Sequence, residues 1–317
     1  MKTLWKWLPN TIDRRVRVAA WASLVSQILI IGTGGAVRLT GSGLGCPTWP
    51  RCTEDSFVTT AEMGFHGVIE FGNRLLTFAL IVIAMAMFLF VLRMRRERPE
   101  LFRLSLGVGL GIPGQAVIGG LTVLMDLNPY VVGLHYLLSA VLVGVAALLL
   151  YRVRSGRKRA DWGVPAPVRA LSGVLLGVLG VSIVMGIMTT GSGPHAGDAG
   201  AARNGLDSWL LQHFHAWPSY VVLGLMVTLT TLAWFQGVGS QRFRRAITGS
   251  LVVTMFQIAV GLFQANNGLP VIAVGIHMVL AAVVVACVVT ALLAQREPSI
   301  PAGAGQSLPR ETAASNS

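Results

Sequence analysis

The sequence predicts an all-α membrane protein with eight spanning helices, and three observations support this. Of its 317 residues, 53% are hydrophobic and 12% are charged, whereas soluble domains carry about 25% charged residues. The apolar residues gather in eight runs, each near the roughly 20 residues that a helix needs to cross a bilayer. The basic residues gather between alternate runs. Such a chain cannot cover its surface with charge, so we expect a lipid bilayer to surround it.

The eight apolar runs give the expected helices in chain order. Short polar or basic segments separate them, and the mean hydropathy of the whole chain is +0.66. The tail at 296–317 is rich in Pro, Gly, Ser and Ala and is expected to be disordered. The expected spans are 18–37, 63–92, 104–124, 131–151, 168–188, 208–235, 246–264 and 271–294.

The distribution of charge predicts the orientation. Lys and Arg cluster before the first span and in every second inter-helix segment, whereas the opposite loops hold only Arg38, Arg51 and Arg203. This is the positive-inside pattern, which predicts a multi-pass inner-membrane protein with both termini in the cytoplasm. The net charge of +12 therefore reports topology, and we expect no nucleic-acid partner. The basic segment 1–17 lacks a clear small-residue cleavage site, so we expect a cytoplasmic lead and a retained anchor rather than a cleaved signal peptide.

The strongest internal signal is a repeat at a spacing of 142 residues, joined by a looser match at a spacing of 150. An even number of helices per copy makes two copies parallel, related by an axis along the membrane normal. We therefore expect two pseudo-twofold-related four-helix bundles, at 18–155 and 156–295. The matched segments are QAVIG at 115–119 with QIAVG at 257–261, GLHYLLSA at 133–140 with GIHMVLAA at 275–282, and TGSG at 40–43 with TGSG at 190–193.

Four histidines lie on the helices that are expected to run from outside to inside. His66, His135, His215 and His277 all fall within about two turns of the external end, so they share one depth. Two facing imidazoles in a four-helix core can bind the iron of a porphyrin from both faces. The alternative is a polar side chain that bonds a neighbouring helix. A pair that repeats at matched depth favours the haem ligands, and His215 with His277 is the clearer pair.

The first half differs, because the repeat places Asn73 where the second half has His215. Asn73 is a poor iron ligand, and it shares one helical face with His66 and Glu70. Glu70 either pairs with Arg74 at i+4 or acts as a proton relay or general acid/base beside a bound ring. The asymmetry suggests that one half holds a permanent cofactor and the other a substrate that comes and goes.

Two arginines lie nearest these sites. Arg38 and Arg74 can form bidentate bonds with haem propionates, although interfacial snorkelling is the alternative for Arg38. His195, in an external loop, is expected at the surface. Four aromatic residues near the external ends are expected to form an interfacial belt: Trp49, Tyr130, Trp209 and Trp217.

Cys46 and Cys52 both lie in the first external loop, in CPTWPRC at 46–52. That compartment is oxidising, so a disulfide is expected, with two free thiols as the alternative. A zinc site would need more ligands than this loop offers. Cys287, in the last span, is expected to be a small core residue.

In combination, these motifs resemble the haem A synthase family. The matching segments keep the order of the family and cover nearly all of 18–294. They are RLTGSGLGCPTWP at 38–50, EFGNR at 70–74, GGLT at 119–122, GLH at 133–135, TGSGPHAGD at 190–198, HA at 215–216 and GIH at 275–277.

The resemblance implies a fold, a reaction and two haem sites. The C-terminal bundle would hold a haem b through His215 and His277, and the N-terminal bundle would bind haem O as substrate with His135 as one ligand. Glu70 matches the functional glutamate of the family. A ring methyl of haem O would be oxidised to a formyl group by two successive hydroxylations, with loss of water from a geminal diol.

The resemblance also carries one departure and several expected partners. Many members have a second histidine where this chain has Asn73, so either His66 replaces it or His135 alone holds the substrate iron. Cys46 and Cys52 match the external cysteine pair of the family, which can exchange between thiol and disulfide. The expected partners are haem O, the haem O synthase that supplies it, and an electron donor that the sequence does not identify. Lipid-facing Gly, Met and Trp residues permit a homo-oligomer.

Two other classes of protein share some of these features. A dihaem protein that passes quinol electrons should have two equivalent histidine pairs, and Asn73 counts against it. A haem carrier would bind the same group without chemistry.

Overall fold

The computed structural model describes residues 5, 7–155 and 161–296, and within these residues it is all-helical, without strands. Each predicted span lies inside one helical segment, and eight helices are long and apolar enough to cross a membrane. The prediction of an all-α protein with eight spans is therefore confirmed. Most of the predicted tail, 297–317, lies outside the described residues. The helices are α2 (Arg14–Leu39), η1 (Ala61–Met63), α3 (Gly64–Leu92), α4 (Pro99–Leu124), α5 (Pro129–Ser155), α6 (Ala166–Ser192), α7 (Ser208–Phe235), α8 (Gln241–Asn266) and α9 (Val271–Ala294).

Polar caps and prolines fix where the helices begin. Asp13, Asp207 and Ser240 each accept a hydrogen bond from a backbone N–H in the first turn of α2, α7 and α8, at 3.1, 2.9 and 3.2 Å. These side chains satisfy donors that a helix start leaves free. Pro99 and Pro129 begin α4 and α5, where a missing N–H costs nothing. Fixed helix starts hold the side chains of the following turns at defined depths.

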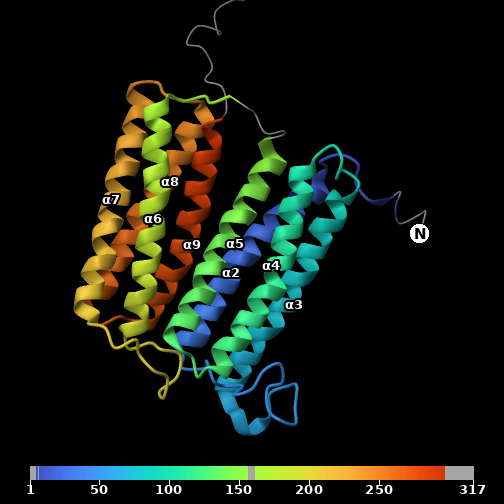
Figure 1. The fold of residues 1–317 in the computed structure, drawn as a ribbon, viewed down its shortest axis with the longest axis vertical. Coiled ribbons are helices and arrows are strands. Elements are labelled where there is room, and N and C mark those ends of the chain that lie inside the picture. The colour runs from blue at the N-terminus through green and yellow to red at the C-terminus, as the bar shows by residue number, and fades with distance from the viewer. Residues whose placement is uncertain (1–4, 6, 156–160, 297–317) are drawn as a thin grey trace, which may run out of the picture.

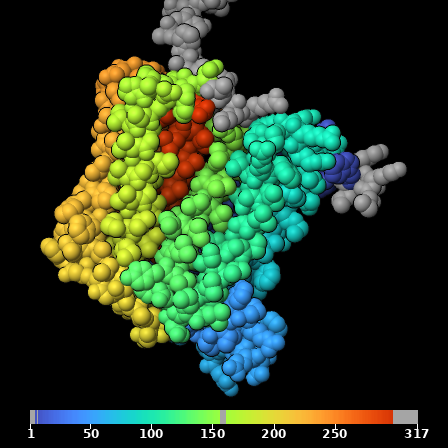
Figure 2. Space-filling view, viewed as in Figure 1, coloured from blue at the N-terminus to red at the C-terminus, as the bar shows by residue number. Residues whose placement is uncertain are grey.

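The helices form two groups of four, which lie side by side in Figure 1. In the first group, α2 and α4 each contact both α3 and α5, so the four helices close into a ring. In the second group, α6, α7, α8 and α9 contact one another in sequence, but α6 and α9 barely touch. Figure 2 shows the surface of α9 between those of α6 and α5. The pseudo-twofold relation between the groups stays a prediction.

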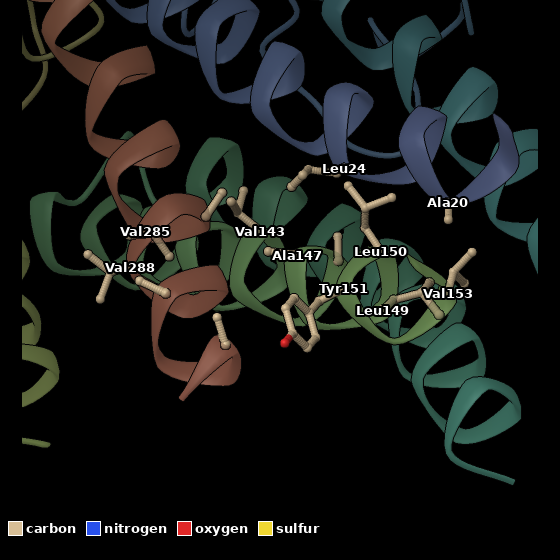
Figure 3. Packing of buried hydrophobic residues seen from close by; sticks show 14 of the residues in the cluster. Ala20, Leu24, Val143, Ala147, Leu149, Leu150, Tyr151, Val153, Val285 and Val288 are labelled. Atoms are coloured by element: carbon tan, nitrogen blue, oxygen red, sulfur yellow. The ribbon is translucent and has the colours of Figure 1, made fainter. Parts of the chain in front are cut away.

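The two groups meet along α5 and α9, with α2 packed on both. Leu24, Ala147 and Val288 are buried at this junction, one from each of the three helices (Figure 3). Of these, Ala147 is small, and small side chains let helices approach closely in a membrane, where packing rather than hydrophobicity drives association. Further out, Tyr136 Oη lies 3.5 Å from the carbonyl oxygen of Met278. These two residues are 142 positions apart, which is the spacing of the sequence repeat.

The two long loops, 40–60 and 193–207, lie at the same end of the bundle (Figure 1). We call this the long-loop end; the charge pattern predicts that it is external. The short turns α4–α5 and α8–α9 also lie there, and both contain a leucine in the left-handed region. Leu127 and Leu269 each have φ of 58°, and they are again 142 positions apart.

Candidate functional site

A cavity of about 880 Å³ lies toward the long-loop end, and residues from all eight long helices line it. Ligand pockets are typically about 300–1,000 Å³ and mostly apolar, so this cavity has room for a large ligand or for two. His135, His215 and His277 line it, together with Glu70, Asn73, Arg74 and Arg38. Of the eight residues predicted for the haem sites, these seven line the cavity, and the eighth, His66, does not.

The rings of His215 on α7 and His277 on α9 face each other across the second group of helices. Their centroids are 6.1 Å apart and their planes are 83° apart. With metal–imidazole bonds of about 2.0–2.1 Å and a ring radius of about 1.15 Å, two imidazoles on opposite sides of one metal have centroids roughly 6.3 Å apart. The observed centroid separation of 6.1 Å is close to that spacing.

His215 is oriented by the helix beside it. Its Nδ1 lies 2.8 Å from the carbonyl oxygen of Ser182 on α6. Metal-binding histidines usually donate their second ring N–H to such an acceptor, which fixes the tautomer and leaves Nε2 for the metal. The arrangement of His215 is that of a ligand with its outer partner in place.

His277 has a different neighbour, the side chain of Gln257 on α8. The amide Nε2 lies 3.2 Å from Nε2 of the ring. His277 Nδ1 and Gln257 Oε1 are buried without a hydrogen-bond partner among the described residues. Because buried polar atoms are nearly always paired, these two atoms are consistent with a ligand that completes the site.

His135 on α5 also lines the cavity, but its ring has fewer contacts. Gln115 on α4 donates to the carbonyl oxygen of His135 (3.1 Å) and to Ser139 Oγ (2.9 Å), not to the imidazole. The Nδ1 of His135 is buried without a partner in the part of the chain that the structure describes. The imidazole of His135 thus has fewer hydrogen-bond partners than the imidazoles of His215 and His277.

Glycines on neighbouring helices give the three imidazoles their space. A Cβ at Gly186 or Gly261 would lie 2.9 Å from Cε1 of His215 or His277, respectively, and a Cβ at Gly119 would lie 3.3 Å from Cε1 of His135. Distances under 3.0 Å are prohibitive unless something shifts. Glycine at positions 186 and 261 therefore lets the rings of His215 and His277 lie this close to the adjacent helix, whereas a Cβ at position 119 would require a shift of only a few tenths of an ångström.

Asn73 and His66 are placed differently from the other candidates. Asn73 lines the cavity, and its Oδ1 accepts a hydrogen bond from Thr33 Oγ1 at 2.8 Å. His66 is exposed, and its Nδ1 lies 2.9 Å from Ser42 Oγ in the first loop. The structure therefore does not bring His66 to the cavity that holds His135.

Glu70 is buried and makes two charge-assisted contacts. Its Oε1 lies 2.5 Å from Nη2 of Arg74, one turn along α3, which is the i+4 pair that the sequence suggested. Its Oε2 accepts a hydrogen bond of 2.6 Å from the backbone N–H of Cys46. The structure joins Cys46 and Cys52 in a disulfide, as expected. Glu70 thus links the cavity wall to the disulfide loop.

The two arginines hold loop backbone. Arg38 donates from Nε to His195 O (2.6 Å) and from Nη2 to Thr190 O (3.0 Å), which ties the end of α2 to the second long loop and to the last turn of α6. Arg74 donates to the carbonyl oxygens of Cys46, Thr48 and Arg51 in the first loop. Both arginines also line the cavity. Their binding of haem propionates stays a prediction.

Two predictions about the loops are wrong, because a loop can fold back over a cavity in a way that local sequence does not reveal. Trp49 was assigned to the interfacial belt, but its side chain lines the cavity. His195 was expected at the surface, but it lines the cavity too, and its Nε2 lies 3.0 Å from Leu269 O. The sequence also left Gln115 and Gln257 without a role, although both stand in the repeated segments.

The described residues contain no cluster of three or more His, Cys, Asp or Glu side chains that could hold a bare metal ion. A porphyrin needs only one or two axial ligands from the protein, since its own nitrogens supply the other four. A histidine pair in a large apolar cavity fits such a group better than it fits a free ion.

These features define a polytopic α-helical membrane protein with a large, histidine-lined cavity. Comparison with known families places it further: the model of the COX15-CtaA family, described as cytochrome oxidase assembly proteins, matches residues 17–289. The chain belongs to this family.

Several curated relatives carry the name heme A synthase. The relative from Geobacillus thermodenitrificans is 29% identical over 150 residues, which are 47% of this chain and 46% of the relative. The relative from Sphingopyxis alaskensis is 28% identical over 329 aligned positions, which cover 86% of this chain and 89% of the relative. The chain thus spans about half the length of the Geobacillus relatives that it matches and most of the Sphingopyxis one.

Proposed function

We propose that this protein is a haem A synthase, an enzyme that oxidises a ring methyl of haem O to a formyl group during oxidase assembly. The observation that carries the proposal is the placement of three imidazoles on one apolar cavity, two of them with centroids 6.1 Å apart. Membership of the cytochrome oxidase assembly family and the names of the relatives support the same reaction.

In this proposal the two groups of helices have different tasks. His215 and His277 hold a resident haem b, and His135 holds the iron of haem O. A bound haem b supplies one-electron and oxygen chemistry that no side chain can provide. The substrate site then has one strong protein ligand, because Asn73 is bonded to Thr33 and His66 lies outside the cavity lining.

The remaining residues of the site position groups and move protons. Two successive hydroxylations of the methyl carbon release water and require proton transfer near the ring. Glu70 is the carboxylate at the cavity, and its Oε1 and Oε2 can exchange a proton there when the contacts with Arg74 and Cys46 loosen. Arg38 and Arg74 carry positive charge at the long-loop end, where propionates would be compensated.

We also propose the orientation and partners that the charge pattern and the reaction require. The protein lies in the cytoplasmic membrane with both termini on the cytoplasmic side, and the long-loop end faces outward. Haem O arrives from the haem O synthase that makes it, and an electron donor outside this chain supplies the reducing equivalents. Homo-oligomers stay an expectation.

The asymmetry of the two halves favours this function over the alternatives. A dihaem electron carrier needs two equivalent ligand pairs, but the position equivalent to His215 is Asn73. A haem carrier needs no buried carboxylate beside its ligand, yet Glu70 is buried in the cavity wall.

The test is a reconstituted assay. The purified protein, in lipid and loaded with haem b, receives haem O and oxygen, with a quinol, a reduced ferredoxin or a dithiol as donor in separate arms. The products are identified by reduced pyridine-adduct spectra and mass. We expect formyl-haem from the wild type and none from His135→Ala. If the intact, haem-loaded protein forms no formyl-haem in any arm, the proposal is wrong.

A further inference from the structure

Trp49 reaches the cavity from a loop rather than from a helix. It lies in the middle of the disulfide loop, between Cys46 and Cys52, and it lines the cavity together with Pro50. Its indole packs directly on the backbone of Gly120 in α4, where a Cβ would collide with ring atoms Cδ2, Cε2 and Cγ. The contact therefore requires glycine at position 120.

The indole and an imidazole lie against consecutive residues of α4. A Cβ at Gly119 would contact His135 Cε1 at 3.3 Å, and Gly120 carries Trp49. Consecutive residues of an α-helix point about 100° apart, so the glycine pair admits two rings from two directions. One comes from α5 and the other from the loop, at the same level of the cavity.

The loop that carries Trp49 is anchored at several points. Arg74 donates from Nη2 to Cys46 O at 2.9 Å, and from Nη1 to Thr48 O at 3.0 Å and Arg51 O at 3.1 Å. Glu70 accepts from the N–H of Cys46. The disulfide closes the segment on itself. These contacts hold the loop backbone on both sides of Trp49, so the indole has a defined place.

The second half of the chain lacks this arrangement. The repeat places Leu262 at the position of Gly120, and Leu262 itself lines the cavity. The second long loop, 193–207, contains no Trp, Tyr or Phe, and the ring that it brings to the cavity is the smaller imidazole of His195. The C-terminal half therefore has a leucine at the position where the N-terminal half has the glycine that carries the indole of Trp49.

We propose that Trp49 is a substrate-positioning residue, which forms the loop wall of the haem O site and packs its indole against the flat apolar ring. This inference rests on the proposed function. An aromatic face offers a large apolar surface with defined stacking geometry. A wall carried by a loop suits a ligand that must enter and leave, whereas a wall built into a helix suits a permanent one.

The test measures binding of haem O to protein that already contains haem b. Wild type, Trp49→Ala and Trp49→Phe are titrated with haem O, and the dissociation constant is read from the Soret absorbance. The control is Trp209→Ala, because Trp209 is 67% exposed and does not line the cavity. Haem b content, from the pyridine-adduct spectrum, reports whether each variant folds.

We expect Trp49→Ala to weaken binding about three- to tenfold, the loss that an aromatic contact explains, with haem b content unchanged. Trp49→Phe should recover most of the affinity, and Trp209→Ala should match the wild type. Gly120→Leu, which copies the second half, should displace the indole and weaken binding in the same direction. In turnover, Trp49→Ala should raise KM more than it lowers kcat.

Two outcomes overturn the inference, and they differ. If the wild type binds haem O and Trp49→Ala binds it equally well, Trp49 is only a structural part of the loop and the proposed function stands. If the wild type, with haem b present, does not bind haem O at all, the proposed function falls and the inference falls with it.

Discussion

Glu70 and Arg74 form an ion pair one turn apart on α3, with 2.5 Å between Oε1 and Nη2. The carboxylate is buried, and the guanidinium is 20% exposed. Glu70 also accepts from the backbone of Cys46, so the pair joins the cavity wall to the disulfide loop. The same two side chains thus organise the loop and leave a carboxyl group beside the proposed substrate.

Replacing Glu70 by Gln should lower both activity and stability. The amide keeps the shape but leaves the Arg74 charge uncompensated, and removing one member of a buried pair costs about 3–5 kcal/mol. Because Arg74 is partly solvated, we expect a loss nearer about 2 kcal/mol. Thermal unfolding in detergent measures the stability, and formyl-haem production measures the activity, which should fall at least about tenfold.

The matched control for this variant is Glu62→Gln. Glu62 is exposed in η1, so its neutral form should behave like the wild type in both assays. A Glu70→Gln protein with normal turnover would show that this carboxyl group handles no proton in the reaction.

The three cavity histidines should separate by haem type. His215→Ala and His277→Ala each remove one of two facing rings, so both should lose haem b. His135→Ala should keep haem b and lose retention of haem O, because that ring belongs to the other group of helices. Pyridine-adduct spectra of purified variants measure both haems.

The exposed histidine serves as a test of the missing ligand. His66→Ala should retain haem O like the wild type, because the ring bonds Ser42 and does not line the cavity. His213→Ala is the control, since His213 stacks on Trp209 with ring centroids 4.2 Å apart. Loss of haem O from His66→Ala alone would mean that the first turn of α3 rearranges to bring this ring to the substrate.

Adding a methyl group at the glycines should displace the imidazoles. Gly186→Ala and Gly261→Ala place a Cβ 2.9 Å from a ring carbon, whereas Gly119→Ala places it at 3.3 Å. We expect haem b content to fall in the first two variants, and haem O affinity to change little in the third. The measurement is haem per protein after purification.

The control for the glycine series is Gly224→Ala. A Cβ at Gly224 would meet nothing within 4 Å, and alanine favours the helix by up to about 1 kcal/mol. This variant should keep haem b and unfold at an equal or higher temperature. Equal haem b content in Gly261→Ala and Gly224→Ala would show that His277 does not need its present position.

Local spacing was enough to predict part of the site. The apolar runs gave the spans, because lipid leaves few alternatives to long helices. The positions of His215 and His277 near the external ends of their spans predicted a shared depth, and the centroids of their rings are 6.1 Å apart in the structure. The i+4 spacing of Glu70 and Arg74 gave their ion pair, since helix geometry alone makes such residues neighbours.

Contacts between distant segments were not predictable in this way. Trp49 meets Gly120 across 71 positions of sequence, and nothing near either residue signals the other. His195 turns inward because Arg38 binds its backbone from the other half of the chain. One cavity shared by both halves depends on how α2, α5 and α9 pack, and a hydropathy pattern does not specify that packing.

A single difference between the repeats explains why the two glutamines behave differently. Ser139 gives Gln115 a hydroxyl to bond at 2.9 Å, and Gln115 stays off the imidazole of His135. The equivalent position in the second half is Ala281, which has no hydroxyl, and Gln257 turns to the ring of His277 instead. Ser139 thus keeps Gln115 away from the imidazole of His135, whereas Ala281 leaves Gln257 in contact with the imidazole of His277.

Exchanging these two residues should therefore exchange the behaviour. Ala281→Ser should draw Gln257 from His277, and a hydrogen bond worth about 1 kcal/mol corresponds to a shift of roughly 40 mV in a one-electron midpoint potential. A redox titration of haem b measures the shift. Ala281→Gly, which adds no hydroxyl, is the control and should keep the wild-type potential. If the serine variant also keeps it, the amide of Gln257 does not influence the ring, and the contact between them is incidental.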